Sequence, residues 1–288
     1  MLVKFLDIVI AGLLLGGLYA LIAMGLSLQY GVARVFNISH GEFIMLGALS
    51  TWFLFKFGVN PLVSLVICGP IIFIIGFVLY RTVFTHLRTK SASAGAYEGS
   101  SMLASFGLLF IIQNIALISW GSEIKSYTYL TIPVSIAGAL FGANRLIALA
   151  FALFVGLIFY LFLVRTRLGK AIRAAAQDPT TAGLMGVNIN LVLAICFGLG
   201  ALMAGFAGLL ISMCYPVQAT MGLEYTIITI IVVALGGLGS IPGSFIGGFI
   251  LGLIGSIVTA IEPGLTLAAY YLIFMLLLLV KPTGILGR

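Results

Sequence analysis

Residues 8–28 read IVIAGLLLGGLYALIAMGLSL, a run of 21 residues without a charged side chain. A helix rises about 1.5 Å per residue, so such a run crosses a hydrocarbon core about 30 Å thick. Together with this one, the apolar runs of the chain lie at 5–30, 61–81, 100–120, 145–164, 189–213, 223–236, 243–260 and 265–281. The predicted fold class is therefore all-α: a polytopic transmembrane helical bundle of eight spans, with the run at 42–57 as a candidate ninth.

The composition agrees with a membrane protein. Of 288 residues, 62% are hydrophobic and 7% are charged, whereas soluble proteins carry roughly 25% charged residues. An outer-membrane barrel is excluded because barrel strands alternate apolar and polar residues over only ~10 positions. The net charge of +7 comes from basic residues dispersed between the apolar runs, so no nucleic-acid partner is expected. The three cysteines form no CxxC pair, and we expect no metal site.

The chain is expected to form a single transmembrane domain, 1–288, because no loop is long enough to bury a core of its own. Small residues at four-residue spacing, such as Gly12/Gly16 and Gly248/Gly252, allow helix backbones to approach closely in lipid. Two runs, 42–57 and 223–236, are short and lie next to polar or glycine-rich breaks. We interpret both as short or interrupted helices, and 42–57 either crosses the membrane or enters it and returns.

Basic residues indicate the orientation of the chain. Nine of the fourteen lie on one side of the predicted topology, in the loops 81–99 and 165–188 and in the tail that contains Lys281 and Arg288. Loops rich in Lys and Arg remain in the cytoplasm. We therefore predict a cytoplasmic C-terminus, whereas the side of the N-terminus depends on whether 42–57 crosses.

The first break gathers Asn37, Ser39, His40 and Glu42 between two apolar segments. One interpretation is structural: Ser39 and Glu42 match the S-x-x-E capping box at the start of a helix. The other is functional, because polar side chains inside a membrane are costly and mark substrate pathways. We place all four residues near a translocation path as a hypothesis.

The second break, 236–244, reads GGLGSIPGS. Ser240 is a candidate N-cap, and Pro242 is tolerated in a first helical turn. Both breaks precede a helix that carries small residues, so an internal duplication is one possibility, and in transporters corresponding interrupted helices surround the pathway. The second set of candidate path residues is therefore Gly236, Gly237, Gly239 and Pro242.

The loop 165–188 is predicted to form two short helices outside the membrane. Asp178 and Pro179 form an N-cap and first-position pair, and Gly186 is a candidate C-cap. Basic residues such as Arg173 are explained in part by anchoring of the cytoplasmic side. Anchoring by basic residues does not require a pair of helices, so we favour the interpretation that this loop is a docking element for a cytoplasmic partner.

No reaction centre is recognisable. The sequence lacks GxxxxGK[ST], HExxH and GxSxG motifs, and its two histidines offer no obvious base for Ser27. We expect no catalytic residue, no cofactor bound by this chain and no enzymatic activity. A self-sufficient secondary carrier or channel remains an alternative, although the spans contain few ionisable residues beyond Glu42 and Glu224.

Several motifs together resemble the permease subunits of branched-chain amino acid ABC importers, of the LivH type. They are Tyr30-Gly31-Val32, Asn37-Ile38-Ser39-His40-Gly41-Glu42, Gln177-Asp178-Pro179, Gly186-Val187-Asn188, Leu235-Gly236-Gly237-Leu238-Gly239-Ser240-Ile241-Pro242-Gly243 and Lys281-Pro282-Thr283-Gly284. The resemblance covers essentially the whole chain. Urea and amide permeases share these motifs, so they remain alternatives.

The resemblance implies a multi-pass subunit of the bacterial inner membrane that transports leucine, isoleucine, valine or a similar small solute. It implies four further partners: a second related permease, two cytoplasmic ATPases that use ATP, and a periplasmic substrate-binding protein. Arg173, Asp178, Pro179 and Gly186 would then belong to the element that couples the permease to an ATPase. The loop departs from the general EAA pattern of ABC importers, because no Glu precedes Ala175 and Thr180 replaces the expected Gly.

Overall fold

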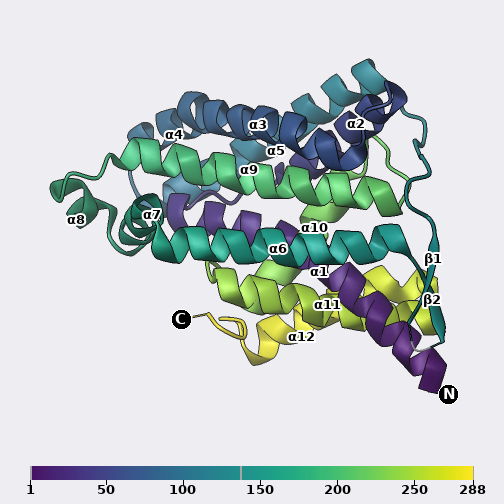
Figure 1. Cartoon of the computed structure of the whole chain (residues 1–288). Coiled ribbons are helices and arrows are strands. Elements are labelled where there is room, and N and C mark those ends of the chain that lie inside the picture. Colours follow the sequence, from purple (N-terminus) through teal and green to yellow (C-terminus); the bar gives the residue numbers. More distant parts are fainter. Residues whose placement is uncertain (1, 137, 288) are drawn as a thin grey trace.

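The computed structural model of the chain describes residues 2–136 and 138–287 (Figure 1). The helices of its seven long apolar segments are α1 (Leu2–Ala33), α3 (Pro61–Leu79), α5 (Ala94–Trp120), α6 (Ala143–Arg165), α9 (Ile189–Cys214), α11 (Ile241–Ile261) and α12 (Thr266–Val280), the last reaching this length together with the 3₁₀ turn before it. Short helices are α2 (His40–Lys56), α4 (Thr85–Lys90), α7 (Arg167–Gln177), α8 (Pro179–Leu184) and α10 (Gly222–Gly236). A π-helical turn, Tyr80–Phe84, joins α3 to α4, and a 3₁₀ turn, Pro263–Leu265, precedes α12.

The predicted helical membrane bundle is confirmed. Seven helical segments are long and apolar enough to cross a membrane, and α10 is a shorter apolar helix. Both runs that we predicted to be short, 42–57 and 223–236, correspond to the short helices α2 and α10. One element was not predicted: the loop after α5 contains a hairpin of β1 (Pro133–Ile136) and β2 (Ala139–Gly142), two antiparallel strands of four residues each.

The two ends of the bundle differ. Helices α7 and α8 project from one end, and the β1–β2 hairpin covers part of the other, where α1 begins (Figure 1). An isolated bridge joins Lys125 to Val217, so the loop after α9 also lies at the hairpin end. Arg288, which we counted in the basic tail, lies outside the described residues.

Helices α1 and α9 form the centre of the bundle, and α12 is the least covered span. In the most apolar window of α9, 78% of residues are buried, against 6% for α12. The two central helices touch through glycine: a Cβ at Gly25 would lie 2.7 Å from the Gly200 carbonyl oxygen, and a Cβ at Gly200 equally close to the Gly25 carbonyl oxygen. Packing of backbone on backbone through small residues is the contact that membrane helices favour.

Helix α2 begins inside the bundle and not at its surface. The first residue of α2 is His40, and its Nε2 atom lies 3.2 Å from the carbonyl oxygen of Ile22. Ile22 lies eleven residues before the end of α1, a distance of about 16 Å along the helix. Beyond its other end, Asn60 accepts a hydrogen bond of 3.0 Å from Tyr129 at the hairpin end. Segment 34–39 therefore turns back along α1, and together with α2 it returns the chain to the hairpin end.

Candidate functional site

The four predicted path residues of the first break are buried in the bundle, and the side chains of Asn37, Ser39 and His40 are hydrogen-bonded to one another or to α1. Asn37 donates to Gln29 Oε1 at 3.0 Å, and Gln29 donates to the Phe197 carbonyl oxygen of α9 at 3.0 Å. His40 Nδ1 lies 3.2 Å from the same Gln29 oxygen. Gln29 therefore links the break to both central helices.

The capping-box prediction for Ser39 and Glu42 is wrong. Ser39 occupies the N-cap position of α2, but its hydroxyl donates to Asn37 Oδ1 at 2.7 Å and makes no cap bond. The amide of Gly41 instead donates to the hydroxyl of Thr226, on α10, at 2.8 Å. A side chain from a distant helix thus supplies the cap, because the Asn37 amide oxygen takes the Ser39 hydroxyl.

The N-termini of α2 and α10 meet at this point. Thr226 also donates to the carbonyl oxygen of Ile38 at 3.0 Å, so its hydroxyl is bonded on both sides. A Cβ at Gly41 would overlap the Gly222 carbonyl group, and a Cβ at Gly222 would overlap the Glu42 carboxylate. Backbone therefore excludes a side chain at Gly41, whereas at Gly222 a side chain would have to displace the Glu42 carboxylate, and the site brings together the positive ends of two helix dipoles.

Glu42 is the exceptional group of the site. Its side chain is fully buried, and neither carboxylate oxygen has a hydrogen-bond partner within residues 2–136 and 138–287. A buried carboxyl group without a partner is costly. It lies against the first residue of α10, Gly222, where the helix dipole favours negative charge.

Helix α5 holds the break from a third side. Ser105 accepts from the amide of Ile38 at 3.0 Å and donates to the carbonyl oxygen of Phe36 at 3.2 Å. Sequence analysis missed Gln29, Ser105 and Thr226, which bond the break from α1, α5 and α10. In the sequence, each of the three residues stands out only as a polar residue within an apolar span. That feature does not indicate which part of the chain the side chain contacts.

A polar cavity of about 490 Å³ opens near the hairpin end, between the N-terminal half of α1, α11 and α12. Its polar lining includes Asp7, Arg145 and the four tyrosines Tyr19, Tyr215, Tyr225 and Tyr270. Arg145 lies over the Tyr215 ring, with its guanidinium carbon 5.6 Å from the ring centre. We call it the outer cavity; its lining residue Tyr225 directly precedes Thr226, the α10 residue that bonds the first break.

The second break does not join the first. Gly237 and Gly239 have positive φ angles of 105° and 80°, and Ser240 accepts the cap hydrogen bond from the Gly243 amide at 3.2 Å, as predicted. The C-terminal tail covers the end of α10, because Leu286 donates to the carbonyl oxygen of Gly236 at 3.1 Å. Pro242 lies in the first turn of α11.

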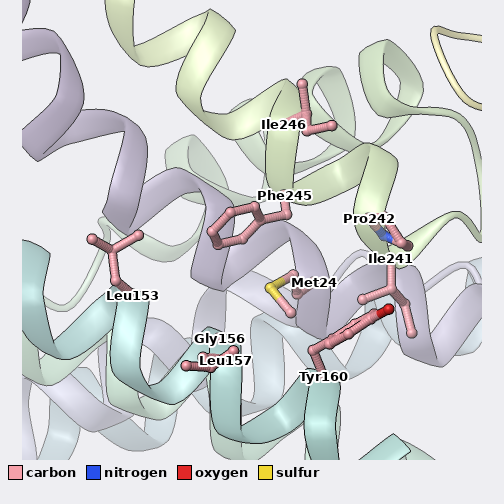
Figure 2. A pocket seen from close by; sticks show the side chains of 9 residues that line it. All are labelled: Met24, Leu153, Gly156, Leu157, Tyr160, Ile241, Pro242, Phe245 and Ile246. Carbon is pink, nitrogen blue, oxygen red and sulfur yellow. The ribbon is translucent and has the colours of Figure 1, made fainter. Parts of the chain in front are cut away.

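Pro242 faces an apolar cavity of about 430 Å³ between α1, α6 and α11 (Figure 2). The other labelled side chains around it, which include Met24, Tyr160 and Phe245, come from these three helices. Gly239 packs against Gly31, near the end of α1. The structure therefore places only Pro242 of the second predicted set beside this apolar cavity, whereas Gly236 and Gly237 lie under the C-terminal tail, and the role of the set in the path remains a prediction.

Helices α7 and α8 form the predicted pair outside the bundle. Asp178 caps α8 by accepting from the amides of Thr180 and Thr181 at 2.8 and 3.2 Å, and Pro179 is its first residue. Hydrogen bonds from the hydroxyl and amide of Thr181 lower the pKa of the Asp178 carboxyl group. Gly186, with φ of 86°, follows the C-cap residue, and its amide donates to the Gly183 carbonyl oxygen at 3.0 Å.

The tip of this pair carries two apolar side chains that sequence analysis overlooked. Leu184 is 84% exposed and Met185 is 81% exposed. Arg173, on α7, donates to the carbonyl oxygen of Val164 at 3.3 Å and is otherwise exposed. The tip is thus apolar, whereas the base of the pair is basic.

A family profile described as branched-chain amino acid transport system / permease component matches residues 8–281. The chain belongs to this permease family. The resemblance seen in the sequence motifs is thereby confirmed, and the protein is a membrane transport permease.

Named relatives match this permease over nearly its full length. The high-affinity branched-chain amino acid transport system permease protein BraD of Pseudomonas aeruginosa is 31% identical, over 99% of this chain and 96% of its own. LivH of Salmonella typhimurium shows the same identity and coverage. The probable LivH permease of Methanocaldococcus jannaschii is 28% identical over 94% of this chain and 89% of its own.

The fold of the permease also occurs in a solved structure. PsaBC from Streptococcus pneumoniae in complex with Fab aligns with a TM-score of 0.52, over 98% of this chain and 97% of that chain. The sequence identity is 13%, so this likeness concerns the fold alone.

Proposed function

We propose that this permease is the membrane subunit of an ATP-driven importer that moves leucine, isoleucine and valine across the inner membrane. The substrate class is supported by the relatives, which are described as branched-chain amino acid permeases. The sequence carries no GxxxxGK[ST] motif, so separate ATPase subunits would hydrolyse the ATP.

The observation that carries the proposal is the exposed tip of α7–α8. Leu184 and Met185 lie at the end of a helix pair that bears Arg167, Lys170 and Arg173, so the tip faces water and not lipid. Exposed apolar side chains rimmed by polar groups mark protein contact sites. The proposed partners are two cytoplasmic ATPases, one of which receives this tip, together with a second related permease and a periplasmic binding protein.

The same arrangement supports one orientation of the permease in the membrane. Basic loops remain in the cytoplasm, and α7–α8 belongs to the most basic loop. The C-terminus would then be cytoplasmic, and the hairpin end with the outer cavity would face the periplasm.

The outer cavity suits the zwitterion of an amino acid. Arg145 supplies a cation for the carboxylate and has no acidic partner among the described residues, while Asp7 supplies an anion for the ammonium group. The tyrosine rings offer apolar surface to an aliphatic side chain. From this cavity the proposed path leads past the N-terminus of α10 to Glu42 and His40.

Access to the path would alternate as ATP binding draws the subunits together. A ligand shifts such an equilibrium only if it binds one state better than the other. ATP binding would make the ATPase favour one conformation of the importer. The α7–α8 tip would pass the resulting movement of the ATPase to α6 and α9, the helices that precede and follow the pair in the chain.

The subunit assignment is tested with the tagged, full-length chain purified from native membranes in mild detergent. We expect a soluble ATPase and a second permease to co-purify, and we expect Leu184→Ser with Met185→Ser to lose the ATPase but retain the permease. Leu238→Ser serves as the control, since Leu238 is also exposed but lies in the second break. A chain that purifies alone and still transports leucine in vesicles contradicts the proposal.

The zwitterion site is tested by measuring leucine uptake. Arg145→Gln removes the charge-assisted hydrogen bonds to the carboxylate, so we expect the apparent KM to rise about tenfold with membrane abundance unchanged. Lys125→Gln is the matched control, because Lys125 lies at the same end but pairs with Glu123 at 3.4 Å and does not line the cavity. Equal effects of the two substitutions would refute a role for Arg145.

A further inference from the structure

A second polar cavity, of about 380 Å³, lies at the α7–α8 end of the bundle. It opens between the end of α1, the segment that joins α4 to α5, and the start of α8. Its polar lining consists of Arg34, Arg88, Ser91, Ser93 and Tyr97, and none of its lining residues is acidic. This cavity is separate from the outer cavity, and it adjoins the start of the first break through Arg34.

Two buried polar atoms of the cavity lining lack a hydrogen bond of good geometry. They are Arg88 Nη1 and the Tyr97 hydroxyl, and within the described parts of the chain the polar group close to both is the Tyr80 hydroxyl, which lies behind the lining. Tyr97 is only 6% exposed. Buried polar groups are normally bonded, so an unpaired cluster of donors calls for an explanation such as a bound ligand.

Every one of these groups can donate a hydrogen bond, and one is always charged. Ser93 is the N-cap of α5, so the cavity also borders the positive end of a 27-residue helix. The cavity lining therefore offers hydrogen-bond donors and positive charge and contains no carboxylate, so it favours an anion as ligand. Tetrahedral oxyanions suit this set best, because a guanidinium group binds their oxygens in pairs.

The backbone at Arg34 supports the same conclusion. Arg34 has φ of 53°, one of two residues other than glycine with positive φ among the described residues. Such a conformation is strained for a residue other than glycine, and it occurs preferentially at functional sites such as ligand clamps. Arg34 directly follows Ala33, the last residue of α1, and with this conformation it lines the same cavity as Arg88.

We propose that this cavity binds a phosphate group, held by Arg34 and Arg88 and by the hydroxyl of Tyr97. The group is either free phosphate or the headgroup of an anionic phospholipid at the membrane surface. Pro179, the first residue of α8, forms part of the same lining. The bound anion therefore touches the helix pair at its base and stabilises one position of α8 relative to α1 and α5.

Calorimetric titration of the full-length chain with sodium phosphate tests the site, in a phosphate-free detergent buffer and against sodium chloride of equal ionic strength. We expect saturable binding of phosphate and none of chloride. Arg34→Gln should weaken binding at least about tenfold, because a hydrogen bond to a charged group of about 1.5–3 kcal/mol is lost. Arg34→Lys, which keeps the charge, should weaken it less.

Arg81→Gln is the matched control, since Arg81 is exposed in the same basic region but does not line the cavity. Repeating the titration in nanodiscs distinguishes the two sources of phosphate: phosphatidic acid competes if the ligand is a headgroup, and it leaves the affinity unchanged if the ligand is soluble. The proposal is overturned if wild-type protein shows no phosphate binding beyond chloride, or if Arg34→Gln and Arg81→Gln behave alike.

Discussion

At the scale of single residues, one hydroxyl group connects segments that are far apart in the sequence. Thr226, itself buried, accepts from the Gly41 amide in a buried hydrogen bond and donates to the Ile38 carbonyl in a partly buried one. Leaving a buried group unsatisfied costs about 1–3 kcal/mol. The join between α2 and α10 therefore depends strongly on this side chain.

We expect Thr226→Val, which keeps the shape and removes the hydroxyl, to lower the free energy of unfolding by about 1–3 kcal/mol. Thr229→Val is the matched control, since Thr229 is equally buried but bonds only to the carbonyl oxygen of Tyr225 on its own helix. Unfolding in detergent, followed by circular dichroism against temperature, measures the difference. Equal losses for the two variants would show that the interhelical bonds contribute little.

At the scale of elements, α8 is too short to be stable by itself and depends on its ends. Asp178 caps the first turn, and the amides of Gly186 and Val187 donate to the carbonyl oxygens of Gly183 and Ala182 at 3.0 and 3.1 Å. Isolated helices of this length are marginal in water. Both ends were predicted because N-caps and glycine C-caps are local signals in the sequence.

We expect Asp178→Ala to reduce transport more than membrane abundance, because it uncaps a helix that lies outside the bundle. Asp178→Asn should retain most of the activity, since asparagine caps as well as aspartate. Uptake normalised to the amount of protein in the membrane provides the measurement. A parallel fall of abundance and uptake in the alanine variant would assign Asp178 a purely structural role.

The cap also has a predictable dependence on pH. The pKa of Asp178 is lowered in the folded protein by the bonds from Thr181 and Thr180, so the ionised form is favoured. Its stabilisation is complete above the unfolded pKa of about 3.9, and it is lost as pH falls through the lower folded value. Hydrogen exchange at the Thr181 amide should therefore be protected equally at about pH 5 and pH 7, and less at about pH 3.

At the scale of the whole molecule, the bundle has two chemically different ends. The α7–α8 end is basic, and the hairpin end carries the outer cavity and the start of α1 (Figure 1). Because α2 completes the return begun by segment 34–39, the N-terminus and α7–α8 lie at opposite ends. The sequence patterns did not predict the side of the N-terminus, because that side depends on whether the short run 42–57 crosses the membrane.

We expect Lys4→Cys to react with a membrane-impermeant maleimide added to spheroplasts, and Leu286→Cys to react only after the membrane is permeabilised. The three native cysteines are free but buried or half-buried, so they give a low background. Mass spectrometry of the labelled chain reports both positions. Labelling of Leu286→Cys in intact spheroplasts would reverse the proposed orientation.

Local sequence patterns are enough to predict the all-α class, the spans, the two short helices and the caps of α8 and α11. These features follow from run length, from composition and from signals within a few residues, which do not depend on distant parts of the chain. The pairing of the polar groups, by contrast, depends on how the helices pack: Asn37 bonds to Gln29, Gly41 to Thr226, and Ile38 to Ser105. The capping box failed for this reason, because the energy of a buried hydrogen bond depends on which partner packing brings within reach.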